Sequence, residues 1–96
     1  MATALLVGLL APAAHGASVR ECGDFTSAYA GNITTRIVTC SEARRVVRAW
    51  NKTAAKRGGN GRVLSYYCKY RDIKWEAGDI RCTATGGRVV HWQTGV

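Results

Sequence analysis

Few residues of this chain could transfer protons in a reaction. In a ribonuclease, a glutamate and a histidine share proton transfer while an arginine stabilises the charge on the phosphate. Glu76 and His91 could supply that pair, and Arg71 or Arg81 the cation. The spacing of these residues does not require such an arrangement. A strand histidine in a small protein is usually a surface or edge residue, which is the competing interpretation of His91. His91 and Glu76 are weak catalytic candidates, and with no triad motif around His91 an enzyme is the less favoured class.

The four cysteines, Cys22, Cys40, Cys68 and Cys82, could be metal ligands or disulfide partners. Zinc sites usually contain Cys-x-x-Cys pairs, and no two of these cysteines have that spacing. His91 is the only histidine after residue 16 that could complete a ligand set. We therefore expect no metal and no cofactor, and two structural disulfides.

A basic stripe on one predicted helix is the main candidate for binding. At about 100° per residue, one side of the segment that begins near Cys40 carries only cations. The stripe consists of Arg44, Arg45, Arg48, Lys52 and Lys56. Such a surface concentrates polyanions, namely nucleic acid, anionic cell-wall polymers or lipid headgroups. The competing interpretation is a solvated face that keeps a small protein soluble.

The opposite side of the same helix is apolar and must pack on a sheet. Its members fall within an arc of roughly 100°, and they are Ala43, Val46, Val47, Trp50 and Ala54. Thr39 or Ser41 can cap the N-terminus, and the glycines of residues 58–61 end the helix. Trp50 lies in the middle of the stripe and is expected to be the central packing residue.

Alternating residues predict strands at 32–40, 62–71, 79–85 and 88–93, with an extended arm over 17–31. Tyr66 and Tyr70 share a predicted buried face, whereas Tyr67 points the other way and is a candidate for contact with a partner. For the last hairpin, a loop that includes Arg88 would place Cys82 opposite Trp92. The predicted fold is α+β, one amphipathic helix on a mostly antiparallel sheet of about four strands, stapled by disulfides.

The disulfide pairing has two solutions. If residues 72–78 form a hairpin connection, Cys68 and Cys82 meet on the helix-facing side of the sheet. Cys22 would then tie the N-terminal arm to Cys40 at the start of the helix. This pairing is preferred, and Cys22–Cys82 with Cys40–Cys68 is its rival.

The first residues resemble an export signal rather than part of the domain. The apolar run of residues 4–11 is too short to span a bilayer, and Ala14 and Gly16 suit a signal-peptidase site. No Lys or Arg precedes Arg20, although such signals usually carry positive charge. We expect a signal peptide at 1–16 and one small secreted domain at 17–96. That domain contains all 14 basic and all six acidic residues, so its formal net charge is +8. A domain this small buries little core, so we expect disulfides to stabilise it.

Several short motifs resemble those of small exported disulfide-containing proteins of actinobacteria and their phages. They are Cys-Gly at 22–23, Val-Thr-Cys at 38–40, Ala-Arg-Arg-Val-Val-Arg-Ala-Trp at 43–50, Tyr-Tyr-Cys at 66–68 and Ile-Arg-Cys-Thr at 80–83. The final Gly-Gly-Arg-Val-Val-His-Trp at 86–92 completes the series. The resemblance implies export, disulfides and a helix-plus-sheet fold, and it implies no activity and no site residues.

Three classes of function remain open. The favoured one is a secreted, non-enzymatic binding module whose basic helix face contacts a cell-wall polymer, nucleic acid or a membrane surface. The second is a small secreted nuclease. The third is a protease inhibitor that presents a rigid loop at 51–61 or 72–78. The sequence does not indicate an oligomeric state.

Overall fold

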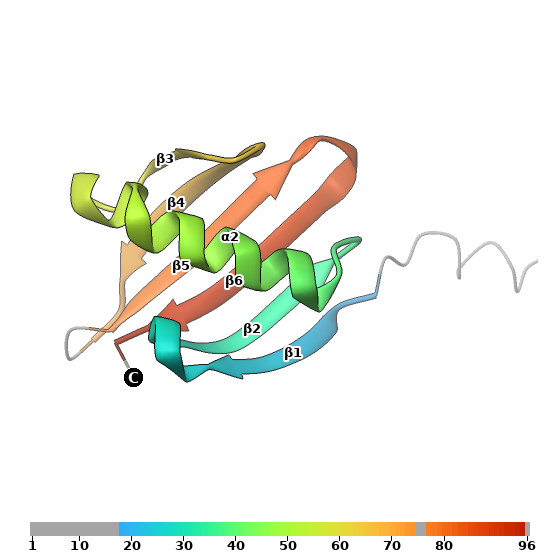
Figure 1. Ribbon diagram of the computed structural model, residues 1–96, viewed down its shortest axis with the longest axis horizontal. Coiled ribbons are helices and arrows are strands. Elements are labelled where there is room, and N and C mark those ends of the chain that lie inside the picture. Colours follow the sequence, from blue (N-terminus) through green and yellow to red (C-terminus); the bar gives the residue numbers. More distant parts are fainter. Residues whose placement is uncertain (1–17, 75–76, 96) are drawn as a thin grey trace, which may run out of the picture.

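The computed structural model describes residues 18–74 and 77–95 (Figure 1). The predicted signal peptide and the catalytic candidate Glu76 lie outside these residues. The strands are β1 (Arg20–Phe25), β2 (Ala30–Arg36), β3 (Gly61–Val63), β4 (Tyr66–Asp72), β5 (Gly78–Ala84) and β6 (Arg88–Thr94). The helices are η1 (Thr26–Ala28), α2 (Cys40–Lys52), η2 (Ala54–Arg57) and η3 (Thr85–Gly87).

The strands form one six-stranded sheet in the order β1-β2-β6-β5-β4-β3, and each neighbouring pair is antiparallel. The predicted helix-on-sheet α+β class is confirmed, but the estimate of about four strands was wrong. β1 was mistaken for an extended arm, because register shifts on both sides of Gly23 interrupt its alternation. β3 and β4 were merged into one strand. Leu64 adopts a left-handed backbone (φ 56°) between them and turns the chain, an unusual conformation for a leucine.

Helix α2 lies diagonally across one face of the sheet (Figure 1). The predicted apolar stripe is the buried one, with Ala43, Val46, Val47, Trp50 and Ala54 all at most 4% exposed. From the sheet, Ile33, Ile80, Val90 and Trp92 are buried beneath it. The predicted rotation of the helix about its axis is therefore confirmed, and the core lies in the single layer between helix and sheet.

Both ends of the helical segment have local causes. Thr39 is the N-cap, and its hydroxyl accepts a hydrogen bond of 3.1 Å from the backbone N–H of Glu42. The α-helix stops at Lys52, earlier than the glycines would place it, and continues as the 3-10 turn η2. Gly58 then adopts a left-handed backbone (φ 89°), and the N–H of Gly59 donates to the carbonyl of Ala54. This closure is the glycine stop that the sequence predicts.

Thr39→Ala should lower the free energy of unfolding by about 1 kcal/mol, because one N-terminal N–H loses its acceptor. Urea denaturation followed by circular dichroism measures the change. Ser41→Ala is the matched control, since Ser41 is exposed within the first turn and does not cap. Equal losses in the two variants would show that the cap does not contribute.

The register of the last hairpin differs from the predicted one. The loop is Thr85–Gly87, and Arg88 is already in β6, where it pairs with Ala84. Cys82 therefore lies opposite Val90, not Trp92, a shift of two residues. Such a shift keeps every side chain on its predicted face, because the side-chain period of a strand is two. Gly86 and Gly87 supply the left-handed conformations (φ 81° and 80°) that this loop requires.

Both disulfides have the preferred pairing, Cys22–Cys40 and Cys68–Cys82, and no cysteine is free. The first bridge joins the edge strand β1 to the start of α2. The second joins directly opposed residues of β4 and β5 and is fully buried. Within the described residues, no helix has the length and apolar character that crossing a bilayer requires.

Candidate functional site

One face of the sheet carries no helix in the part of the chain that the structure describes. The turns η1 and η2 each contact α2, which lies on the opposite face. Strand alternation places a set of mostly polar side chains on the uncovered face, which we call the open sheet face. Its members are Glu21, Thr34, Arg36, Arg62, Tyr67, Lys69, Arg71, Asp79, Arg81, Thr83, Val89, His91 and Gln93. Five of these residues are basic and two are acidic.

Strand pairing arranges these residues in rows that cross the sheet. The middle row runs Glu21, Thr34, His91, Arg81, Lys69, with each residue directly opposite the next. His91 belongs to β6, which lies between β2 and β5 in the interior of the sheet. It is therefore not the edge residue that a lone strand histidine usually is. The row places two cations on one side of the imidazole and a carboxylate at the other end.

His91 forms a close pair with Asp79. Its Nε2 lies 2.7 Å from Oδ1 of Asp79, and the two side chains are 29% and 15% exposed. Since a carboxylate only accepts hydrogen bonds, Nε2 carries the proton in this pair, and Nδ1 of the neutral ring is left as an acceptor. Nη2 of Arg71 lies 3.6 Å from the second oxygen of Asp79. Asp79 thus orients the imidazole and links it to a cation.

A hollow of about 510 Å³ lies over this pair. Its lining residues are Lys69, Arg71, Arg81, Asp79, His91 and Tyr70, so three of the six are cations. The ring of Tyr70 stacks on Trp50 on the helix side, and its hydroxyl donates to Asp72 over 2.9 Å, which raises the pKa of the phenol. A smaller hollow of about 100 Å³ continues past His91 toward Arg36. The described residues include no group of three or more His, Cys, Asp or Glu side chains suited to a metal ion.

A second row crosses the open sheet face beside the first and carries an exposed aromatic ring. It runs Arg36, Val89, Thr83, Tyr67, Arg62. Tyr67 is 48% exposed, whereas Tyr66 on the other face is fully buried. The predicted orientation of Tyr67, away from the core and beside Lys69, is therefore confirmed. A tyrosine between cations can stack on a planar group while the cations bind neighbouring anionic groups.

The predicted basic stripe lies on the other side of the molecule, and part of its charge is already engaged. Arg45 forms a two-pronged ion pair with Glu42 at 3.0 and 3.3 Å, which raises the pKa of Arg45. The guanidinium of Arg48 lies 5.1 Å from the centre of the Phe25 ring. Arg44 is partly buried at the flank of the helix, and Lys52 and Lys56 are exposed.

Glu42 explains why Arg45 is held in place. Its second oxygen also accepts a 3.5 Å hydrogen bond from the hydroxyl of Tyr66. Burial, followed by the charge of Glu42, raises the pKa of Tyr66. The carboxylate therefore ties the first turn of α2 to β4, and Arg45 belongs to this structural network.

Sequence reasoning missed Asp79 and the density of cations on the open sheet face. The signal was available in part, because Lys69, Arg71 and Arg81 alternate with Cys68, Tyr70 and Cys82 in the predicted strands. What the sequence did not indicate was the register of β5 against β6, which places Arg81 opposite His91 and brings Asp79 beside it. Arg71, Arg81 and His91 do come together, as the ribonuclease hypothesis requires. Glu76 lies outside the described residues, and the carboxylate that the structure describes beside His91 is that of Asp79.

A larger hollow of about 660 Å³ lies on the helix side of the molecule, where Trp50, Tyr70 and Tyr29 contribute to its lining. The lining contains no Lys, Arg, His, Asp or Glu. It offers apolar contact but no charged side chain and no imidazole, so the open sheet face is the candidate site.

No protein-family model, curated protein or solved structure matches this chain. Its function must therefore be inferred from the geometry of the open sheet face.

Proposed function

We propose that the protein is a small secreted binding module for polyanions and that its binding surface is the open sheet face. The observation that carries this proposal is the set of five cations, Arg36, Arg62, Lys69, Arg71 and Arg81, on one uncovered sheet face. Clustered cations attract a polyanion by releasing its condensed counterions. The two disulfides and the apolar segment at residues 4–11 support export to an oxidising compartment.

Nucleic acid is the polyanion that this surface suits best. Tyr67 exposes its ring between Arg62 and the cations of the middle row, so a base could stack while flanking phosphates meet Arg62 and Lys69. Lipid headgroups and cell-wall polymers offer no flat ring for Tyr67. The helix face is a weaker surface for the same partner, because Glu42 already balances Arg45 and Phe25 contacts Arg48.

A triple substitution on the open sheet face tests the proposal. Arg62→Gln, Lys69→Gln and Arg81→Gln together should weaken binding of a labelled single-stranded DNA. They should also lower the slope of log affinity against log salt by about 2, because three phosphate contacts are neutralised. Fluorescence anisotropy at several salt concentrations measures both quantities.

The matched control is a triple substitution on the helix, Arg44→Gln, Arg48→Gln and Lys52→Gln. It removes the same charge and should leave the slope nearly unchanged. If the salt slope fell in the helix variant and stayed at its wild-type value in the sheet variant, the binding surface would be the helix face. If the wild-type protein bound no DNA at low salt but bound an anionic cell-wall polymer, nucleic acid would be the wrong partner.

A further inference from the structure

We propose that the open sheet face also cleaves RNA, with His91 as the base that activates the 2′-hydroxyl of the substrate. This inference rests on the proposed function, because the same surface must first bind the strand. It adds a reaction to that surface and narrows the partner to RNA.

The proton acceptor is Nδ1 of His91, which forms no hydrogen bond with another side chain among the described residues. Asp79 binds Nε2 at 2.7 Å and thereby fixes the tautomer in which Nδ1 can receive a proton. The pair lines the 510 Å³ hollow, and the imidazole keeps 29% of its surface exposed. An oriented imidazole with one free nitrogen in an open hollow is the arrangement that general-base catalysis needs. Asp79 acts through His91 and is a positioning residue.

The nucleophile must come with the substrate. The larger hollow is lined by no serine, threonine or cysteine, and the hydroxyl of its one tyrosine, Tyr70, donates to Asp72. Thr34, opposite His91, lines only the smaller hollow, whereas Lys69 and Arg71 line the larger one. Both hollows beside His91 open on a surface that suits a nucleic acid strand. RNA carries a hydroxyl next to each phosphorus atom, whereas DNA lacks it. A base in a cationic hollow that holds no protein nucleophile therefore points to RNA as the substrate.

The charges beside His91 are placed for a phosphate. Arg81 lies directly opposite His91, and Lys69 lies directly opposite Arg81 on the next strand. A phosphodiester over Arg81 would have the base on one side and the Lys69 ammonium on the other. Cations in these positions stabilise the extra negative charge that develops when an oxygen attacks phosphorus. Arg71 is held near the hollow by Asp79 at 3.6 Å and adds to the same field.

The reaction that follows is an internal transesterification. Nδ1 of His91 takes the proton of the 2′-hydroxyl, and the 2′-oxygen forms a bond to phosphorus. The bond from phosphorus to the 5′-oxygen breaks, and that oxygen keeps the electron pair and takes a proton from water. The imidazolium returns its proton to the resulting hydroxide. The products are a 2′,3′-cyclic phosphate and a 5′-hydroxyl, and no oxidant or reductant is required.

Three labelled single strands of one sequence test the inference with the oxidised protein: RNA, 2′-O-methyl RNA and DNA. The RNA should be cleaved to products that end in a 2′,3′-cyclic phosphate, and the other two should remain intact. His91→Ala should lower kcat by about 10²- to 10⁴-fold, the usual contribution of a general base. Asp79→Asn should lower kcat while KM changes little, because the carboxylate orients the base. Lys52→Gln, on the helix, should cleave at the wild-type rate.

Thermal melting of each variant checks that it is folded, and the DNA titration checks that the surface still binds. A protein that binds DNA with the expected salt dependence but leaves the RNA intact would overturn this inference and leave the proposed function standing. Cleavage at an equal rate by a folded His91→Ala variant would overturn the assignment to this site. A protein that neither binds DNA nor cleaves RNA would contradict both.

Discussion

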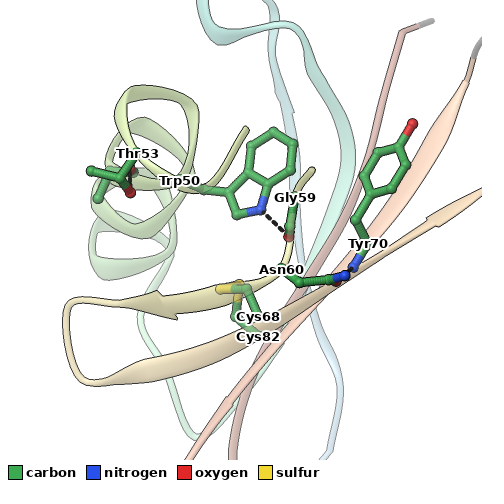
Figure 2. The surroundings of a disulfide bond; sticks show 8 residues. Trp50, Thr53, Gly59, Asn60, Cys68, Tyr70 and Cys82 are labelled. Carbon is green, nitrogen blue, oxygen red and sulfur yellow. Dashed lines mark hydrogen bonds between the residues drawn. A yellow bond between two sulfur atoms is a disulfide. The ribbon is translucent and has the colours of Figure 1, made fainter. Parts of the chain in front are cut away.

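Trp50→Ala should lower the free energy of unfolding by about 3–5 kcal/mol, the usual cost of removing a buried aromatic side chain. Trp50 is 4% exposed, and it packs edge-on against Trp92 at 5.8 Å and stacks on Tyr70 at 6.2 Å between ring centres. Its Nε1 also donates to the carbonyl of Gly59 over 3.0 Å (Figure 2). One side chain thus holds the helix, the turn after η2 and two strands together.

The expected loss is a large part of the stability of so small a domain, since whole domains are stable by only about 5–15 kcal/mol. Urea denaturation followed by circular dichroism measures it. Trp50→Phe separates the two contributions, because it keeps a ring and removes the donor to Gly59, and it should cost less than the alanine variant. Arg48→Ala on the exposed side should cost at most about 1 kcal/mol, from its contact with Phe25. Equal costs for Trp50→Ala and Arg48→Ala would contradict the packing described.

The helix could be predicted from the sequence because its determinants are local. The apolar period from Ala43 to Trp50, the cap at Thr39 and the glycines after Arg57 all act within a few residues of where they stand. The determinants of the strand faces are equally local, since alternation alone places Tyr66 and Tyr67 on opposite faces. The prediction of the two other strands also failed for a local reason. Gly23 and Leu64 adopt left-handed backbones within runs that otherwise alternate.

The site could be predicted only in part, because it depends on the exact register between β5 and β6 and not only on their being neighbours. His91 and Asp79 are twelve residues apart, and they meet because β5 and β6 pair with Arg81 opposite His91. That register follows from the conformations of Gly86 and Gly87. The predicted register, two residues away, would have placed the carboxylate of Asp79 farther along the strand from the imidazole. The basic stripe of the helix is visible in the sequence because its period lies within one segment, whereas the cations of the open sheet face come from four strands.

Removal of the Cys68–Cys82 bridge should have the second largest effect on stability. The double variant Cys68→Ala/Cys82→Ala should lose about 3 kcal/mol from the chain entropy of a loop whose ends are 14 residues apart. Both cysteines are fully buried in the core to which Trp50 also belongs (Figure 2), so the lost packing adds to that cost. Urea denaturation of the oxidised proteins measures the difference.

Cys22→Ala/Cys40→Ala is the matched control, because its loop, with ends 18 residues apart, has nearly the same closure entropy. The two variants should differ in where the loss appears. The control releases β1, an edge strand with two register shifts, so amide exchange should rise first in β1. The Cys68–Cys82 variant loosens β4 against β5 next to the pair Lys69 and Arg81, so exchange should rise there and the site should become less ordered. A loss below about 1 kcal/mol in the Cys68→Ala/Cys82→Ala variant, with β4 and β5 still protected, would show that the strand ladder alone maintains the register of the site.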